Sequence, residues 1–341
     1  MGIPNGPRTW AESKKKRIDT LAASAGRSGR GEGAGDGPGG PATGEAGALK
    51  GAEGVSLLAA AWRRLRRNAV FLIGAAIVLV FVALAIIAPW IAPHDPAGRI
   101  LVDQIRPSNP IPQPQPGFPL GGDSSGRDLL SRLLVGARQT LFVGVMATLG
   151  GLSGGVLLGT LAGAFGGPID SLIMRIVDVM LSIPALLMAF TIAAMFAKPT
   201  QWTVIMAIAI VQVPIFARLL RGSMLAQRRS DHVLAARALG VKQAPIVIRH
   251  MLPNSFGPVI VQATLVIAGA IIDAAALSFL GLGNPDDRSP EWGQMLGKAQ
   301  EFFNTFPHLA MWPAACIIVV ALGFTLMGES LREALDPKSQ R

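Results

Sequence analysis

AVFLIGAAIVLVFVALAIIAPWIAP, residues 69–93, runs for 25 residues without one charged side chain. A helix needs about 20 apolar residues to cross the hydrocarbon core of a bilayer, so this stretch predicts a membrane-spanning helix. Five further apolar runs follow, at residues 140–167, 179–197, 202–217, 258–282 and 309–328, and only the fourth of them contains an acid, Asp273. The sequence therefore predicts an all-α integral membrane protein with six transmembrane helices.

Composition and charge favour the same class. Half of the 341 residues are apolar and only 15% are charged, a balance typical of membrane proteins rather than soluble domains. With the N-terminus in the cytoplasm, segments on the inner side hold 23 Lys and Arg and those on the outer side hold eight. Basic residues concentrate on the cytoplasmic side of membrane proteins. We therefore expect both termini in the cytoplasm and interpret the net charge of +10 as topology, not nucleic-acid binding.

Composition also divides the chain into parts. Between positions 26 and 54 there are 12 glycines and few large apolar residues. Such a segment buries too little apolar surface to offset the entropy of ordering its backbone, so we expect a disordered cytoplasmic tail at 1–68. The other expected parts are a first transmembrane helix at 69–93, an extracytoplasmic loop with an interfacial helix at 94–135, a transmembrane domain at 136–330 with a cytoplasmic loop at 222–256, and a cytoplasmic tail at 331–341.

The interfacial helix is predicted from GGDSSGRDLLSRLLVGARQTL, residues 121–141. Leu129, Leu133 and Leu141 share one helical face, whereas Arg132 and Arg138 fall off it. This pattern is typical of an amphipathic helix that lies at the membrane surface before the second span.

The second span contains LSGGV, residues 152–156, which resembles the LSGGQ signature of ATP-binding cassette ATPases. Such an ATPase also needs a glycine-rich phosphate loop that ends in Gly-Lys-Ser/Thr, and the chain has none. Small residues instead recur every fourth position, at Gly151, Gly155, Gly159 and Gly163. Because small residues let membrane helices approach closely, this ridge predicts a helix-packing face and no nucleotide site.

The long basic loop before the fifth span reads as helix, glycine turn, helix. Ser230 or Asp231 is expected to cap the first helix, and Gly240 is expected to end it in the left-handed conformation. A second helix is expected from Pro245, with Pro253 at the start of the span.

AARALG (235–240) and HMLPN (250–254) occur at the spacing of the cytoplasmic loop of ABC importer permeases, which this loop resembles. The family pattern has Glu and Ile where this chain has Leu234 and His250. Four further segments also resemble dipeptide and oligopeptide permeases of the C type: GDSSGRDLLSRLLVGARQTL (122–141), MRIVDVMLSIPALLMAF (174–190), ALSFLGLG (276–283) and GESLREALDP (328–337). The resemblance covers about residues 69–341.

The resemblance implies a type I ABC importer permease of a bacterial inner membrane. The expected partners are a B-type permease, two cytoplasmic ATPases, an extracytoplasmic binding protein, a peptide substrate and membrane lipid. The loop at 230–253 would couple to the ATPases. The subunit itself is expected to be non-catalytic, without metal or cofactor. The residues that the resemblance assigns to coupling are Asp231, Leu234, Ala235, Ala236, Gly240, His250, Leu252 and Pro253.

Charged residues in or beside the spans raise further expectations. Asp273 is interpreted either as an acid that lines the pathway and meets a peptide's amino group, or as a residue bonded to a neighbouring helix. Arg175 and Asp178 are three residues apart and are expected to pair on one helical face. Pro184 is expected to kink the third span.

Two alternatives stay open at this stage. A related C-type permease for nickel or glutathione would have the same features. A secondary transporter or channel would be expected to carry ion-coupling acids or inverted repeats, and it would leave the basic loop unexplained.

Overall fold

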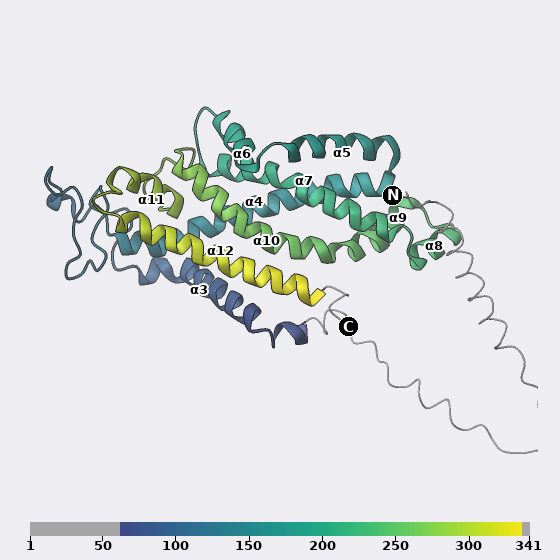
Figure 1. Cartoon of the computed structure of the whole chain (residues 1–341), viewed down its shortest axis with the longest axis horizontal. Coiled ribbons are helices and arrows are strands. Elements are labelled where there is room, and N and C mark those ends of the chain that lie inside the picture. Colours follow the sequence, from purple (N-terminus) through teal and green to yellow (C-terminus); the bar gives the residue numbers. More distant parts are fainter. Residues whose placement is uncertain (1–61, 336–341) are drawn as a thin grey trace, which may run out of the picture. The chain divides into compact units, whose positions relative to one another are not determined.

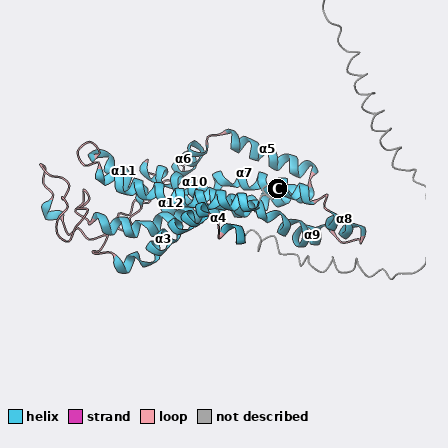
Figure 2. Ribbon diagram, turned by 60° about the horizontal axis from the view of Figure 1, so that its bottom comes forward, coloured by secondary structure: helices cyan, strands magenta, loops and turns pink. Residues whose placement is uncertain are grey.

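The computed structural model describes residues 62–335, so the tails expected before residue 62 and after residue 335 lie outside the described residues. Every regular element in the described part is a helix, as Figures 1 and 2 show. The all-α prediction is therefore confirmed. The helices are α3 (Ala69–Ile91), α4 (Leu129–Phe165), α5 (Gly167–Ser182), α6 (Ala185–Ala194), α7 (Gln201–Gln227), α8 (Asp231–Ala238), α9 (Gln243–Ile246), α10 (Leu252–Phe279), α11 (Trp292–Ala299) and α12 (His308–Leu335), with short turns at Val102–Gln104, Val247–Met251 and Gln300–Phe302.

Five of the described helical runs are long and apolar enough to cross a membrane, and a sixth span is formed if the bent pair α5 and α6 counts as one. The five are α3, α4, α7, α12 and the run from Gln243 to Phe279. Helices α5 and α6 meet at an angle of 96°. The break lies at Pro184, the N-cap of α6, because proline has no N–H to continue the ladder of α5. The predicted kink at Pro184 is confirmed.

The helix expected before the second span forms, but it is continuous with that span. Residues 129–141 are the first turns of α4, which continues without a break for 37 residues. Leu129, Leu133 and Leu141 do share a buried face. Arg132, however, is 1% exposed. Its guanidinium pairs with Asp123, so its charge is compensated inside the protein and not by water at a membrane surface.

The predicted glycine ridge packs α4 against α7, and LSGGV lies within it. A Cβ on Gly155 would stand 2.2 Å from the Cβ of Phe216, and one on Gly151 would stand 2.6 Å from the Cβ of Gln212. Both distances are far below ordinary carbon–carbon contact. The two backbones therefore touch along this seam, and the packing role predicted for these glycines is confirmed.

Helix α12 lies beside α3 and α10 (Figure 1). Gly74 and Gly323 again allow close approach, since a Cβ on Gly74 would stand 2.8 Å from the carbonyl oxygen of Gly323. Helix α12 continues to Leu335, so the tail expected from residue 331 is helical over its first residues.

Candidate functional site

Helices α8 and α9 form a hairpin at one end of the bundle, where the long helices α7 and α10 also meet it (Figure 1). One face of α8 is anchored: Val233 is fully buried and Ala236 is 8% exposed, within a cluster that includes Met224 and Met251. The other face of the hairpin is open, and Leu239 is 83% exposed. One face of the hairpin is thus packed on the helix bundle, and the opposite face exposes apolar side chains to the surroundings.

The turn after α8 is a Schellman motif. Gly240 has a φ of 76°, its N–H donates to the carbonyl of Arg237 at 2.9 Å, and the N–H of Val241 donates to the carbonyl of Ala236 at 3.1 Å. No atom lies within 4 Å of the position that a Cβ on Gly240 would take. Glycine is therefore required here by backbone conformation alone, and the predicted glycine turn is confirmed.

The second arm of the hairpin enters the fifth span without a break, and Pro253 lies in the first turn of α10, as predicted. Helix α9 begins at Gln243, two residues before Pro245, and passes through the π-helical turn into α10. In that turn the N–H of Leu252 donates to the carbonyl of Val247. The wider turn accommodates Pro253, which has no N–H to donate.

Other predicted loop residues differ in their surroundings. Asp231, Leu234 and Ala235 are exposed, whereas Ala236 faces the core. Ser230 is the N-cap of α8, but its hydroxyl donates to the carbonyl of Gln227 at 2.6 Å instead of accepting from α8.

His250 is half-buried, and its carbonyl accepts from the amide of Asn254 at 2.8 Å. The same amide nitrogen lies 3.4 Å from Nε2 of His232 on α8. Asn254 therefore links both arms of the hairpin to the first turn of α10.

A basic groove with a volume of about 680 Å³ runs along the open side of α8. It combines exposed apolar side chains with three cations. Its lining residues are Leu225, Ala226, Arg228, Arg229, Leu234 and Arg237. A partner that fits this groove would offer acidic groups around an apolar pocket.

Asp273 lies in α10, half-buried, with no hydrogen bond or ion pair to any residue between 62 and 335. Gly269, one turn earlier on the same helical face, has no atom within 4 Å of a Cβ position. This face of α10 therefore borders open space in the single chain, and the alternative of a bond to a neighbouring helix finds no partner among the described residues.

The predicted Arg175–Asp178 pair is wrong. Asp178 pairs with Arg218 of α7, and Asp170, two turns earlier on α5, pairs with Arg221. The guanidinium of Arg218 on the neighbouring helix α7 pairs with the carboxylate of Asp178, whereas Arg175, three residues earlier on α5, does not.

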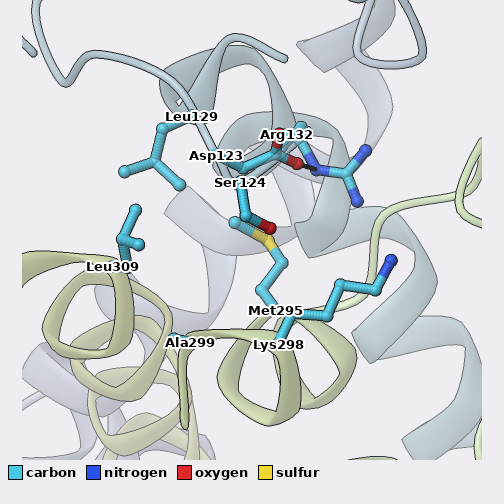
Figure 3. A pocket seen from close by; sticks show the side chains of 8 residues that line it. All are labelled: Asp123, Ser124, Leu129, Arg132, Met295, Lys298, Ala299 and Leu309. Carbon is cyan, nitrogen blue, oxygen red and sulfur yellow. Dashed lines mark ion pairs between the residues drawn. The ribbon is translucent and has the colours of Figure 1, made fainter. Parts of the chain in front are cut away.

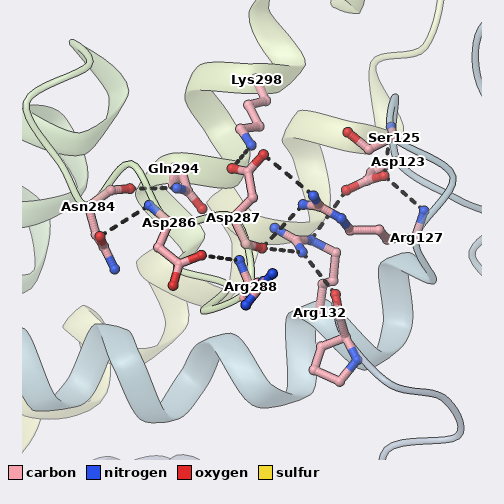
Figure 4. Close-up of polar contacts among 11 residues, drawn as sticks. Asp123, Ser125, Arg127, Arg132, Asn284, Asp286, Asp287, Arg288, Gln294 and Lys298 are labelled. Atoms are coloured by element: carbon pink, nitrogen blue, oxygen red, sulfur yellow. Dashed lines mark hydrogen bonds and ion pairs between the residues drawn. The ribbon is translucent and has the colours of Figure 1, made fainter. Parts of the chain in front are cut away.

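At the other end of the bundle, a polar cluster joins the loop before α4 to the loop before α11 (Figure 4). Arg132 donates to the carbonyl of Asp287 at 3.0 Å and pairs with Asp123 at 3.3 Å, while Arg127 lies 3.5 Å from the Asp287 carboxylate. Lys298 also pairs with Asp287. Burial by itself would raise the pKa of Asp287, but the hydrogen bond from Lys298 and the surrounding cations outweigh it and lower that pKa.

Sequence reasoning missed this cluster because its two halves, the loop before α4 and the loop before α11, are more than 150 positions apart. The only signal in the sequence was the presence of charged residues, Arg127 and Arg132 in one segment and the acids at 286–287 in another, without any indication that they meet. Beneath the cluster lies a cavity of about 20 Å³, bordered by Asp123, Arg132 and Lys298 (Figure 3). It has room for about one water molecule, which makes it far too small for a peptide.

Beside this cluster, α11 is fixed to α4 and α10. The indole of Trp292 is 1% exposed and donates to the carbonyl of Leu133 at 2.9 Å. Glu291 is 4% exposed, and its carboxyl oxygens lie 3.0 and 2.9 Å from the hydroxyl of Ser278. Burial raises the pKa of Glu291 to about 7, against the opposing effect of the Ser278 hydrogen bond.

Comparison with known proteins gives a consistent match. Residues 155–341 match the family of binding-protein-dependent transport system inner membrane components, and residues 56–114 match the N-terminal transmembrane domain of oligopeptide transport permease C. A dipeptide transport system permease of Alkalihalophilus pseudofirmus is 41% identical, over 82% of this chain and 89% of that protein. A di/tripeptide permease of Pseudomonas aeruginosa is 41% identical, over 81% and 91%.

A glutathione transport system permease of Escherichia coli is 42% identical, over 81% of this chain and 89% of that protein. Among solved structures, the MetNI methionine ABC transporter in inward-facing conformations matches with a TM-score of 0.49 and 16% identity, over 61% of this chain and 98% of that chain. With the family model covering more than half of the sequence, the chain belongs to the binding-protein-dependent transport system inner membrane components and is a multi-pass permease of the bacterial inner membrane.

Proposed function

We propose that this permease is the C-type subunit of an ATP-driven importer for di- and oligopeptides. It would pair with a B-type permease, two cytoplasmic ATPases and an extracytoplasmic binding protein. The observation that carries the proposal is the α8–α9 hairpin, which is anchored on one face and exposes Leu234 and Leu239 on the other. The peptide permeases named above support the substrate class.

In this proposal the open face of α8 sits in a cleft of an ATPase. Leu234 fills an apolar pocket there, and the neighbouring arginines meet acidic groups. The helical run from Gln243 to Phe279 is 37 residues long, so it can carry a displacement over about 55 Å at ~1.5 Å per residue. ATP is used by the partner subunits, and this subunit supplies no catalytic group, metal or cofactor.

The coupling proposal is tested in a complex reconstituted into liposomes with its partner subunits. Leu234→Asp places a charge in the proposed apolar contact, so we expect the ATPases to dissociate during purification. Ile248→Asp is the matched control, because Ile248 is also exposed, at 63%, but lies on the second arm. Retention of the ATPases by Leu234→Asp would contradict the proposed contact.

We also propose that Asp273 lines the pathway and meets the amino group of the peptide. Its support is the absence of a partner among the described residues and the open space beside Gly269. An unpaired acid is costly against lipid, by ~2.5–3.5 kcal/mol on insertion scales. Asp273→Asn should reduce uptake of dialanine while ATPase binding is unchanged. Unchanged uptake would remove Asp273 from the pathway.

Glutathione is the second candidate substrate, because the Escherichia coli relative named as a glutathione permease is as similar as the peptide permeases. Uptake of radiolabelled dialanine with unlabelled glutathione or Ni²⁺ as competitor separates the possibilities. Competition by peptides alone supports the first proposal. If the complex takes up glutathione but not dialanine, glutathione import replaces peptide import as the proposed function.

A further inference from the structure

The corner between α4 and α5 lies beside the α8–α9 hairpin, at the same end of the bundle (Figures 1 and 2). Helix α4 ends at Phe165, and Gly166 and Gly167, with φ values of 66° and 59°, turn the chain directly into α5. The last carbonyls of a helix have no partner within it. The corner therefore offers free backbone acceptors to whatever lies against it.

The hairpin and α7 contact this corner through two side chains, and Arg228 lies close to it. The amide of Gln243, the first residue of α9, donates to the carbonyl of Ala164 at 3.0 Å. Arg221 of α7 binds both carboxylate oxygens of Asp170 in the first turn of α5, with Nη2 to Oδ2 at 2.6 Å. Nη1 of Arg228 lies 3.2 Å from the position that a Cβ on Gly166 would take.

Helix α5 has little else to fix its position. Val177 is its only buried residue, whereas Leu172 and Val179 are 65% and 63% exposed. A second ion pair, Arg218–Asp178, joins α5 to α7, but both side chains are more than half exposed. Exposed pairs contribute little to stability. The position of α5 therefore depends mainly on the corner, whereas α6 is also held by Ala189 and Ala193, which are buried against α7.

We propose that Gln243 and Arg221 are positioning residues for coupling. Through the α4–α5 corner they pass a displacement of the α8–α9 hairpin to α5 and α6, in addition to the direct covalent route into α10. The inference rests on the proposed function, because an ATPase must displace the hairpin. A bidentate Arg–carboxylate pair and a hydrogen bond to a helix C-terminus are both directional contacts, which suits the transmission of movement.

The first experiment measures the number of ATP molecules hydrolysed per dialanine taken up by the reconstituted complex. Gln243→Leu keeps the size of the side chain but removes the donor, so this ratio should rise about fivefold, the factor for a lost hydrogen bond of ~1 kcal/mol. Gln243→Lys restores a donor of similar reach that also suits the negative end of α4. It should return the ratio to the wild-type value.

The ion pair is tested by Asp170→Asn, which should raise the same ratio, and by the exchange Asp170→Arg with Arg221→Asp, which should lower it again. Asp178→Asn is the matched control on the same helix, because its pair is exposed. Equal effects of Asp170→Asn and Asp178→Asn would overturn the role of the corner. An unchanged ratio in Gln243→Leu would overturn the role of Gln243.

A second measurement does not depend on the substrate. Spin labels at Val179 of α5 and Met206 of α7, both exposed, report the distance between these helices after Cys316, the single cysteine, is replaced by alanine. Addition of ATP and vanadate should change this distance in the wild-type complex and in Gln243→Lys. The distance should stay unchanged in Gln243→Leu. A shift in Gln243→Leu equal to the wild type would refute the inference. A wild-type shift without dialanine uptake would instead refute only the peptide substrate.

Discussion

The substitution Gly155→Ala tests the packing of α4 against α7 most directly. The added Cβ would stand 2.2 Å from the Cβ of Phe216, and the backbone nitrogen of Ala217 is 3.0 Å away. Carbon atoms in contact lie about 3.5–4.0 Å apart. The helices must therefore separate by about 1.3–1.8 Å or bend, since neither obstructing atom is at the flexible end of a side chain. Overpacking of this kind costs ~1–3 kcal/mol, and the steric conflict here predicts the upper end of that range.

The assay is thermal unfolding of the purified protein in detergent, followed by intrinsic fluorescence or by loss of soluble protein. Gly269→Ala is the matched control, because Gly269 also lies in a long apolar helix but has no atom within 4 Å of a Cβ position. Alanine is the better helix former by ~0.5–1 kcal/mol, so the control should raise the unfolding temperature while Gly155→Ala lowers it. If the unfolding temperatures of both variants rise by similar amounts, the seam between α4 and α7 is not the close contact described above.

Three further predictions follow from buried or strained positions. The pKa of Glu291 is raised to about 7 from an ordinary 4.5, so the folded protein binds this proton more tightly than the unfolded chain, and stability should fall as pH rises from about 4.5 to about 7. Unfolding temperatures measured across that range should lose this slope in Glu291→Gln; an unchanged slope would assign it to another group. Trp292→Phe removes the hydrogen bond to the carbonyl of Leu133 and should cost ~1–3 kcal/mol in the same unfolding assay, whereas Trp312→Phe, at a 45% exposed position, should cost little. Gly240→Val should uncouple ATP hydrolysis from uptake because a β-branched residue resists a φ of 76°, while Gly240→Asn, which tolerates that region, should stay coupled; normal uptake per ATP in the valine variant would contradict this.

Much of the architecture was predictable from local pattern. Apolar runs located the membrane helices because a helix must be apolar over the whole bilayer thickness, wherever its neighbours lie. The four-residue spacing of Gly151, Gly155, Gly159 and Gly163 predicted a packing seam, since i and i+4 lie on one helical face. Gly240 predicted the turn of the hairpin, because the left-handed conformation is a property of a single residue.

Pairing between distant residues was not predictable in this way. Asp178 has a cation three residues away on its own helix, yet it pairs with Arg218 on α7. Arg132 was expected at a membrane surface, and it is instead buried against Asp123 and the backbone of Asp287. The sequence of a segment shows which charged side chains need a partner, but it does not show which distant residue lies close enough to be that partner.

The sequence by itself determined the helices, the glycine seam and the hairpin turn, because each depends on residues within a few positions of one another. Only the tertiary structure decided that α9 continues into α10 and that Gln243 reaches the end of α4. It also decided that α5 is held chiefly at its corner. Those features depend on which helix ends meet in space, and that is settled by the packing of the whole bundle.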